Sequence, residues 1–314
     1  MITFKREWIK PSTILFATEC PANEKSFAVA LAQAKQCRAK LVVLHVCNGL
    51  TRPSGHASMS NRTRSSLMRT LKPLAQHAHD LGIRCSVAIR EGMEVDEILG
   101  FARERKADRI VLGAHVPGHV GRLLVGSVAE SLLRKADLPV LIAGLQIRDG
   151  AYHEYLTRSV LCSVDAHRSS RTVVRFAAEV AAQYGSDLVL QRVVAPQEFE
   201  RKPSNSALHV MAWDLLQMVP TKLKNKLRIV PIVSMGDPAE ELLYQGRVQK
   251  ADLIVIGAHD ATHFAALSNG AAIYKVLAYS YCPVLTLSPV VLADYGPRSV
   301  TYSEADDRYI AGVV

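Results

Sequence analysis

The chain carries two copies of one pattern, displaced by 144 residues. Residues 107–115 (ADRIVLGAH) recur as residues 251–259 (ADLIVIGAH), and a Pro-Val-Leu stretch begins at both Pro139 and Pro283. The same offset relates two pairs of glycines: Gly92 with Gly236, and Gly126 with Gly270. A shared offset of domain size indicates a duplicated domain rather than a solenoid of short repeats. The length of 314 residues also fits two domains.

The limits of the two copies follow from where the repeat begins and ends. Residues 13–21 (TILFATECP) pair with residues 159–167 (SVLCSVDAH), which places Glu19 opposite Asp165. We therefore expect a first domain over residues 1–150, a second over residues 151–290, and a tail over residues 291–314.

Each copy alternates short apolar runs with helical patterns. Residues 40–46 (KLVVLHV) form an almost continuous apolar run, typical of a strand covered on both faces. Residues 65–82 have a helical pattern, and Asp237 followed by Pro238 is a typical helix start. Alternating strands and helices predict an α/β fold, with a doubly wound parallel sheet in each copy.

The loop over residues 113–127 (GAHVPGHVGRLLVGS) follows one strand and precedes a helix. Ligands of such sheets bind beyond the carboxyl ends of the strands, and a helix start favours an anion. Gly126 would let a phosphate approach the backbone, and Ser127 offers a hydroxyl. On spacing alone, two interpretations of Ser127 stay open: a phosphate contact and a plain helix cap. The loop matches neither the P-loop nor GxGxxG.

Both copies resemble the universal stress protein family, over about residues 10–145 and 156–288. The family's loop, G-x2-G-x9-G-[ST], matches Gly113, Val116, Gly126 and Ser127, with Val in place of the second Gly. The stretches GSVAESLLRKADLPVLI, GDPAEELL and ADLIVIGAH are also typical of the family. The resemblance implies two five-stranded sheets of the adenine-nucleotide alpha-hydrolase-like fold. It also implies that they pack as a pseudo-dimer, with the last strands PVLIAG and PVLTLS paired.

The resemblance further implies an ATP site in domain 1, with Mg²⁺ accompanying the ATP. Glu19 stands where the family has an acid that contacts the adenine or ribose side of ATP. Val116 adds a side chain where ATP-binding members have Gly. The candidate binding residues are Ala17, Thr18, Glu19, Val46, Gly113, Val116, Gly126, Ser127 and Val128.

The corresponding loop of domain 2 is expected to be degenerate. It keeps Asp165, Gly257 and Gly270, but Asp260 puts a negative charge where a phosphate would lie. Two like charges about 4 Å apart cost on the order of 1–4 kcal/mol. Ala271 also lacks the hydroxyl of Ser127. We therefore expect domain 2 to serve mainly through its packing.

The resemblance predicts a non-enzymatic stress-response or signalling module that binds ATP in domain 1. The alternative is an enzyme that hydrolyses ATP or phosphorylates itself, with Ser127 as the acceptor. The alternative lacks a visible base or metal-holding carboxylate beyond Glu19. No GxSxG or HExxH motif is present, and we expect neither catalytic residues nor a metal site.

The charge of +9 is unevenly distributed, because residues 1–150 carry all of the basic excess. Much of it lies over residues 50–78, which we expect to be a solvated loop. Without interleaved aromatic residues, a nucleic-acid site there is not favoured. An apolar run long enough for a membrane span or a secretory signal is absent from the sequence, and the six cysteines form no CxxC. A cytoplasmic protein is expected, and further homo-oligomerisation stays open.

Overall fold

The computed structural model describes residues 6–47, 59–114, 126–147, 156–167, 169–194, 204–258 and 270–295. Val116 and Asp260 lie outside these ranges, and so do residues 50–58 of the basic stretch. All six cysteines lie inside them and are free thiols. None of the helices in these ranges combines the length and apolar character that crossing a membrane requires.

The described strands form one sheet in the order β3-β2-β1-β4-β5-β10-β9-β6-β7-β8. Within each half, neighbouring strands are parallel. The predicted doubly wound fold, with five parallel strands in each half, is therefore confirmed. The strands are β1 Thr13–Ala17, β2 Lys40–Cys47, β3 Cys85–Glu91, β4 Arg109–Gly113, β5 Val140–Ala143, β6 Ser159–Val164, β7 Asp187–Val194, β8 Ile229–Met235, β9 Leu253–Gly257 and β10 Val284–Leu287.

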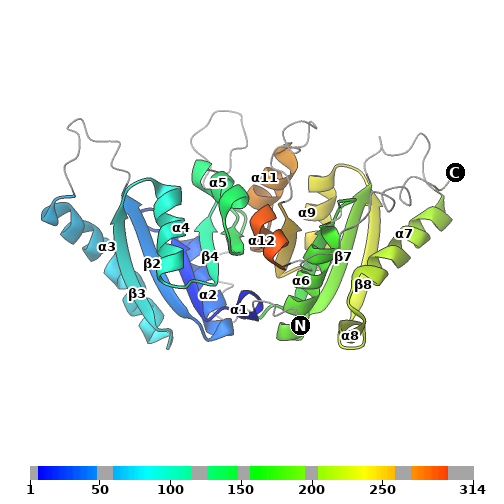
Figure 1. Cartoon of the computed structure of the whole chain (residues 1–314), viewed down its shortest axis with the longest axis horizontal. Coiled ribbons are helices and arrows are strands. Elements are labelled where there is room, and N and C mark those ends of the chain that lie inside the picture. Colours follow the sequence, from blue (N-terminus) through cyan, green and yellow to red (C-terminus); the bar gives the residue numbers. More distant parts are fainter. Residues whose placement is uncertain are drawn as a thin grey trace.

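The two halves are joined by their last strands. Strands β5 and β10 pair antiparallel, with Val140 opposite Thr286 and Ile142 opposite Val284. This antiparallel pair makes the ten-stranded sheet a mixed one, and the two halves lie on either side of it (Figure 1). The arrangement is the intramolecular pseudo-dimer that the resemblance implied.

Alternate residues of each strand point to opposite faces of the sheet, so each face has its own apolar side chains to bury. Helices cover both faces. The core of one face contains Ile14 and Phe16 of β1, and the other contains Leu15. The first face is covered by α2, α3, α6 and α7, and the second by α4, α5, α9 and α11. The helices are α1 Arg6–Ile9, α2 Glu24–Cys37, α3 Asn61–Asp80, α4 Glu94–Glu104, α5 Ser127–Lys135, α6 Ser170–Tyr184, α7 Asn205–Met218, α8 Thr221–Lys224, α9 Pro238–Val248, α11 Gly270–Tyr279 and α12 Pro289–Tyr295.

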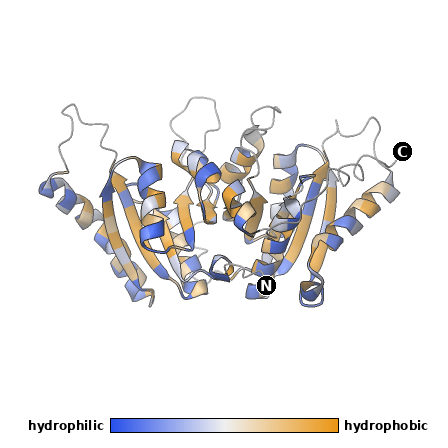
Figure 2. Cartoon of the chain, viewed as in Figure 1, coloured by the Kyte–Doolittle hydropathy of each residue, from blue (hydrophilic) through white to orange (hydrophobic). Residues whose placement is uncertain are grey.

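Helix α3 corrects two expectations about the basic segment. It begins at Asn61, four residues before the predicted helix, because the hydroxyl of Ser60 caps it by accepting a hydrogen bond from Thr63 N at 3.2 Å. The segment from Asn61 onward is therefore helix and not loop. Its cations are exposed on the hydrophilic surface of α3, at the end of the sheet opposite α7 (Figure 2): Arg62, Arg64, Arg69 and Lys72.

Short helices at both ends of the described chain tie the halves together. Helix α1 packs against α6 with Trp8 and Ile9 buried. Tyr184 of α6 donates a hydrogen bond to the carbonyl oxygen of Ile9 at 3.3 Å. Helix α12 contacts both α5 and α6, with Val291 buried, so the predicted limit of domain 2 at residue 290 falls inside a packed helix. The other domain limits stay predictions.

Candidate functional site

A cleft of about 340 Å³ opens in domain 1 at the carboxyl ends of β1, β2 and β4. The starts of α4 and α5 complete its walls. Strand β1 lies between β2 and β4, so the order of connections reverses here. Such a reversal is where open α/β sheets bind their ligands.

Eight of the nine candidates in domain 1 line this cleft. They come from segments far apart in the chain: Ala17, Thr18, Glu19, Val46, Gly113, Gly126, Ser127 and Val128. The ninth, Val116, lies outside the described residues. The structure thus brings these eight residues together, while their contact with a nucleotide stays a prediction.

Gly113 is explained first by packing. A Cβ atom at this position would lie 3.1 Å from both Cβ and Oγ of Ser26. Ser26 is buried at the start of α2, and its hydroxyl donates to the carbonyl oxygen of Asn23 at 3.0 Å. The Asn23 side chain in turn caps α2 by accepting from Ser26 N at 3.1 Å. A glycine at the end of β4 lets the strand lie close to the start of α2 and keeps the cleft open.

Nine further lining residues were missed by sequence reasoning: Asn23, Ser26, Leu44, His45, Glu94, Ile98, Leu112, Ala114 and Ala129. Ser26 left no exact repeat, because the offset of 146 residues that relates Glu19 to Asp165 places Thr172 opposite it. His45 left none either. Its Nδ1 lies 2.9 Å from the carbonyl oxygen of Thr18. Since a carbonyl only accepts, Nδ1 is the protonated nitrogen in this contact, and it holds the end of β1 against β2.

The start of α5 rules out one interpretation of Ser127. Gly126 occupies the cap position without a side-chain hydrogen bond, and Ser127 is the first helical residue. The interpretation of Ser127 as a plain helix cap is therefore wrong. The N–H groups of a first helical turn lack partners within the helix, and here that turn borders the cleft. The turn and the Ser127 hydroxyl are chemically suited to an anion.

The described lining of the cleft carries two carboxylates, from Glu19 and Glu94, and neither a lysine nor an arginine. Within the same described ranges, no three His, Cys, Asp or Glu side chains converge as a metal site would require. Any positive charge on a ligand in the described part of the cleft would be attracted, and any excess negative charge would be opposed.

The corresponding place in domain 2 is built differently. Asp165 follows β6, and its Oδ1 accepts hydrogen bonds from the Ser170 hydroxyl and from His167 N at 3.0 Å. Its carboxylate is thus engaged in holding the start of α6. Gly257 ends β9 in a buried position, and Gly270 begins α11.

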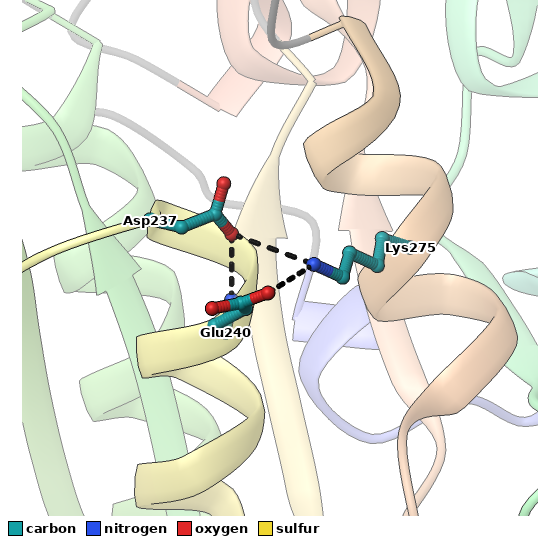
Figure 3. A network of polar contacts seen from close by, with 3 residues as sticks. All are labelled: Asp237, Glu240 and Lys275. Atoms are coloured by element: carbon teal, nitrogen blue, oxygen red, sulfur yellow. Dashed lines mark hydrogen bonds and ion pairs between the residues drawn. The ribbon is translucent and has the colours of Figure 1, made fainter.

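An ion-pair network joins two helices of domain 2 (Figure 3). Lys275 of α11 places Nζ 2.8 Å from Oε1 of Glu240 and 3.8 Å from Oδ1 of Asp237, both at the start of α9. The hydrogen bond with Glu240 raises the pKa of Lys275. The Asp237 side chain also caps α9 by accepting a hydrogen bond from Glu240 N at 2.9 Å. The predicted helix start at Asp237 and Pro238 is therefore confirmed.

Comparison with known proteins agrees with this architecture. The model of the universal stress protein family matches residues 11–144 and 157–288, one match in each half. The chain belongs to the universal stress protein family. The sequence resemblance and its prediction of a tandem member are therefore confirmed.

Relatives of this universal stress protein differ in how much of it they match. The universal stress protein Rv2319c of Mycobacterium tuberculosis is 28% identical over 204 residues, which cover 60% of this chain and 67% of that protein. A universal stress protein from Thermus aquaticus is 31% identical over 132 residues, which cover 41% of this chain and 96% of that protein. A crystal structure of a universal stress protein from Archaeoglobus fulgidus has the same fold, with a TM-score of 0.64 and 19% identity. It covers 90% of this chain and 97% of its own.

Proposed function

We propose that domain 1 of this universal stress protein binds an adenine nucleotide in its cleft. The chain would then act as a non-enzymatic stress-response or signalling module. The observation that supports this most is the meeting of Glu19, Gly126 and Ser127 at the switch point of the sheet. They supply an acid, a close backbone approach and a helix start in one cleft. ATP is the ligand that the loop pattern predicts.

Domain 2, in this proposal, contributes through packing and not through a second binding site. Asp165 is engaged with His167 and Ser170 of its own domain. Ala271, at the position of Ser127, has no hydroxyl to offer a phosphate. One ligand per chain is therefore expected.

The test begins with the mass of any ligand carried through purification, followed by calorimetric titration of the full chain with ATP, with and without Mg²⁺. Ser127→Ala should weaken binding, since it removes one hydroxyl at the start of α5. The reciprocal change in domain 2, Ala271→Ser, is the matched control and should leave one site per chain. Absence of binding at both millimolar ATP and millimolar AMP would overturn the proposal, and two sites per chain would overturn the role given to domain 2.

Incubation with labelled ATP separates the proposal from the enzymatic alternative. We expect neither turnover nor label on the protein. Steady release of phosphate, or label on Ser127, would replace a signalling module with an ATP-hydrolysing or self-phosphorylating enzyme. We also propose that the protein works in the cytoplasm, because six free cysteines suit a reducing compartment.

A further inference from the structure

The start of α4 carries a carboxylate that its repeat in domain 2 lacks. Glu94, the first residue of α4, lines the cleft. The residue 144 positions later is Pro238, which is uncharged. At the preceding position, Asp237 of domain 2 corresponds to Met93 of domain 1. Relative to its repeat, domain 1 therefore lacks the acid at the helix cap and has one at the first helical residue.

The two carboxylates have different surroundings. The negative charge of Asp237 is compensated by two contacts: a hydrogen bond from Glu240 N at 2.9 Å and an ion pair with Lys275 Nζ at 3.8 Å (Figure 3). Glu94 has neither partner, because the position of Lys275 is held by Ser131 in domain 1. In the part of the chain that the structure describes, no basic side chain forms an ion pair with Glu94. As a residue of the cleft lining, Glu94 therefore exposes its charge to whatever occupies the cleft.

The described cleft offers one place suited to an anion, which is the first turn of α5 at Gly126 and Ser127. A helix start can hold one phosphate group. A chain of three phosphates would bring further negative charges into a cleft that already contains the carboxylate of Glu94. Like charges in a partly buried cleft repel each other more strongly than in water.

We infer that Glu94 is a specificity residue that makes the domain 1 cleft prefer an adenine nucleoside monophosphate to the triphosphate. The inference rests on the proposed function, because it concerns the same cleft. It adds the number of phosphates on the preferred nucleotide, whereas the proposed function takes ATP as the ligand from the loop pattern alone. The position of Glu19 is acidic in both domains, since Asp165 stands opposite it, whereas Glu94 has no acidic counterpart in domain 2.

The test is calorimetric titration of the full chain with AMP and with ATP, first in EDTA and then with Mg²⁺. In EDTA, the unmodified protein should bind AMP at least about tenfold more tightly than ATP. Glu94→Gln keeps the shape of the side chain and removes its charge. It should strengthen ATP binding by about tenfold and change AMP binding much less, a difference of about 1.4 kcal/mol.

Asp96→Asn is the matched control. Asp96 lies in the same first turn of α4 but is exposed and outside the cleft lining, so the AMP-to-ATP ratio should not change. The inference is overturned if ATP binds as tightly as AMP in EDTA, or if both substitutions shift the ratio equally. It is also overturned if Glu94→Gln weakens binding of ATP with Mg²⁺, because the carboxylate would then hold the cation. Failure of every adenine ligand to bind overturns the proposed function as well, whereas the other outcomes leave it standing.

Discussion

The buried hydroxyl of Ser288 donates a hydrogen bond to the backbone carbonyl oxygen of Ala136, from the end of β10 to the end of α5. The repeat offset of 144 residues relates Ser288 to Gly144 and Ala136 to Ser280. Gly144 and Ser280 also meet, on the other side of the approximate two-fold axis that relates the halves. A Cβ atom on Gly144 would lie 3.0 Å from the carbonyl oxygen of Ser280. The interface thus repeats one contact twice, as in a symmetric dimer, although one copy uses a serine and the other a glycine.

Gly144→Ala should destabilise the joint between the halves. The added Cβ would lie 2.8 Å from the carbonyl oxygen of Leu277, and backbone must move to relieve the contact. We expect a loss of about 1–3 kcal/mol in the free energy of unfolding, measured by urea denaturation. Gly100→Ala is the control, since it meets open space on α4 and should stabilise by about 0.5–1 kcal/mol. Equal effects at the two glycines would contradict the packing argument.

Ser288→Ala should also weaken the interface, through hydrogen bonds instead of sterics. The Ser288 hydroxyl donates to Ala136 O and accepts from Val291 N at 3.1 Å at the start of α12. Removing it leaves both groups buried and unpaired, at a cost of about 1–3 kcal/mol in unfolding free energy. Exposed Ser65→Ala on α3 should change stability by less than about 0.5 kcal/mol. A Ser288 variant as stable as the Ser65 variant would refute this account.

Arg109 and Gln33 should behave as a coupled pair. Arg109 is buried, and its guanidinium donates to Gln33 Oε1 at 2.6 Å and to the carbonyl oxygen of Trp8 at 2.8 Å. Gln33→Leu leaves a buried cation with one acceptor fewer. The loss should be much smaller in an Arg109→Leu background, which introduces the residue found at Leu253 in domain 2. A double-mutant cycle should give a coupling of about 1–3 kcal/mol, and simple additivity would argue against the pair.

Stability should fall in alkaline solution, in part through Cys282. Burial raises the pKa of this thiol from its ordinary value of 9.0 to about 12. Above pH 9 the Cys282 thiol loses its proton in the unfolded chain but keeps it in the folded chain. The unfolded state is therefore stabilised relative to the folded state. The contribution of one thiol falls by about 1.4 kcal/mol per pH unit between these values. Urea midpoints from pH 7 to 10.5 should decline less steeply for Cys282→Ala, and parallel slopes would contradict the prediction.

Much of the fold could be predicted because its determinants are local or repeated. Alternating apolar runs predict the parallel strands, and the offset of 144 residues predicts that the same topology occurs twice. Asp237 and Pro238 mark the start of α9 by their own chemistry. The start of α3 was misplaced, because the polar residues after Ser60 carry no apolar periodicity and only the cap marks the boundary.

The candidate site was predictable only where the glycine loop or the family resemblance pointed to its residues. The others reach the cleft through topology, which no local pattern reveals. His45 occupies an apolar strand, and Glu94 looks like an ordinary acid in the first turn of a helix. The sequence identifies Gly113 only as the first glycine of the loop motif, whereas its closeness to Ser26 shows a packing requirement that only the fold could disclose.

The pairing of β5 with β10 inside one polypeptide has a consequence for how such a protein can change. In an assembly of identical subunits, every substitution is made twice, so a lost loop is lost on both sides. Here a substitution falls on one half alone, and the partner is always present at a ratio of one to one. One half is thereby free to diverge from the other, as the contrast between Ser127 and Ala271 illustrates.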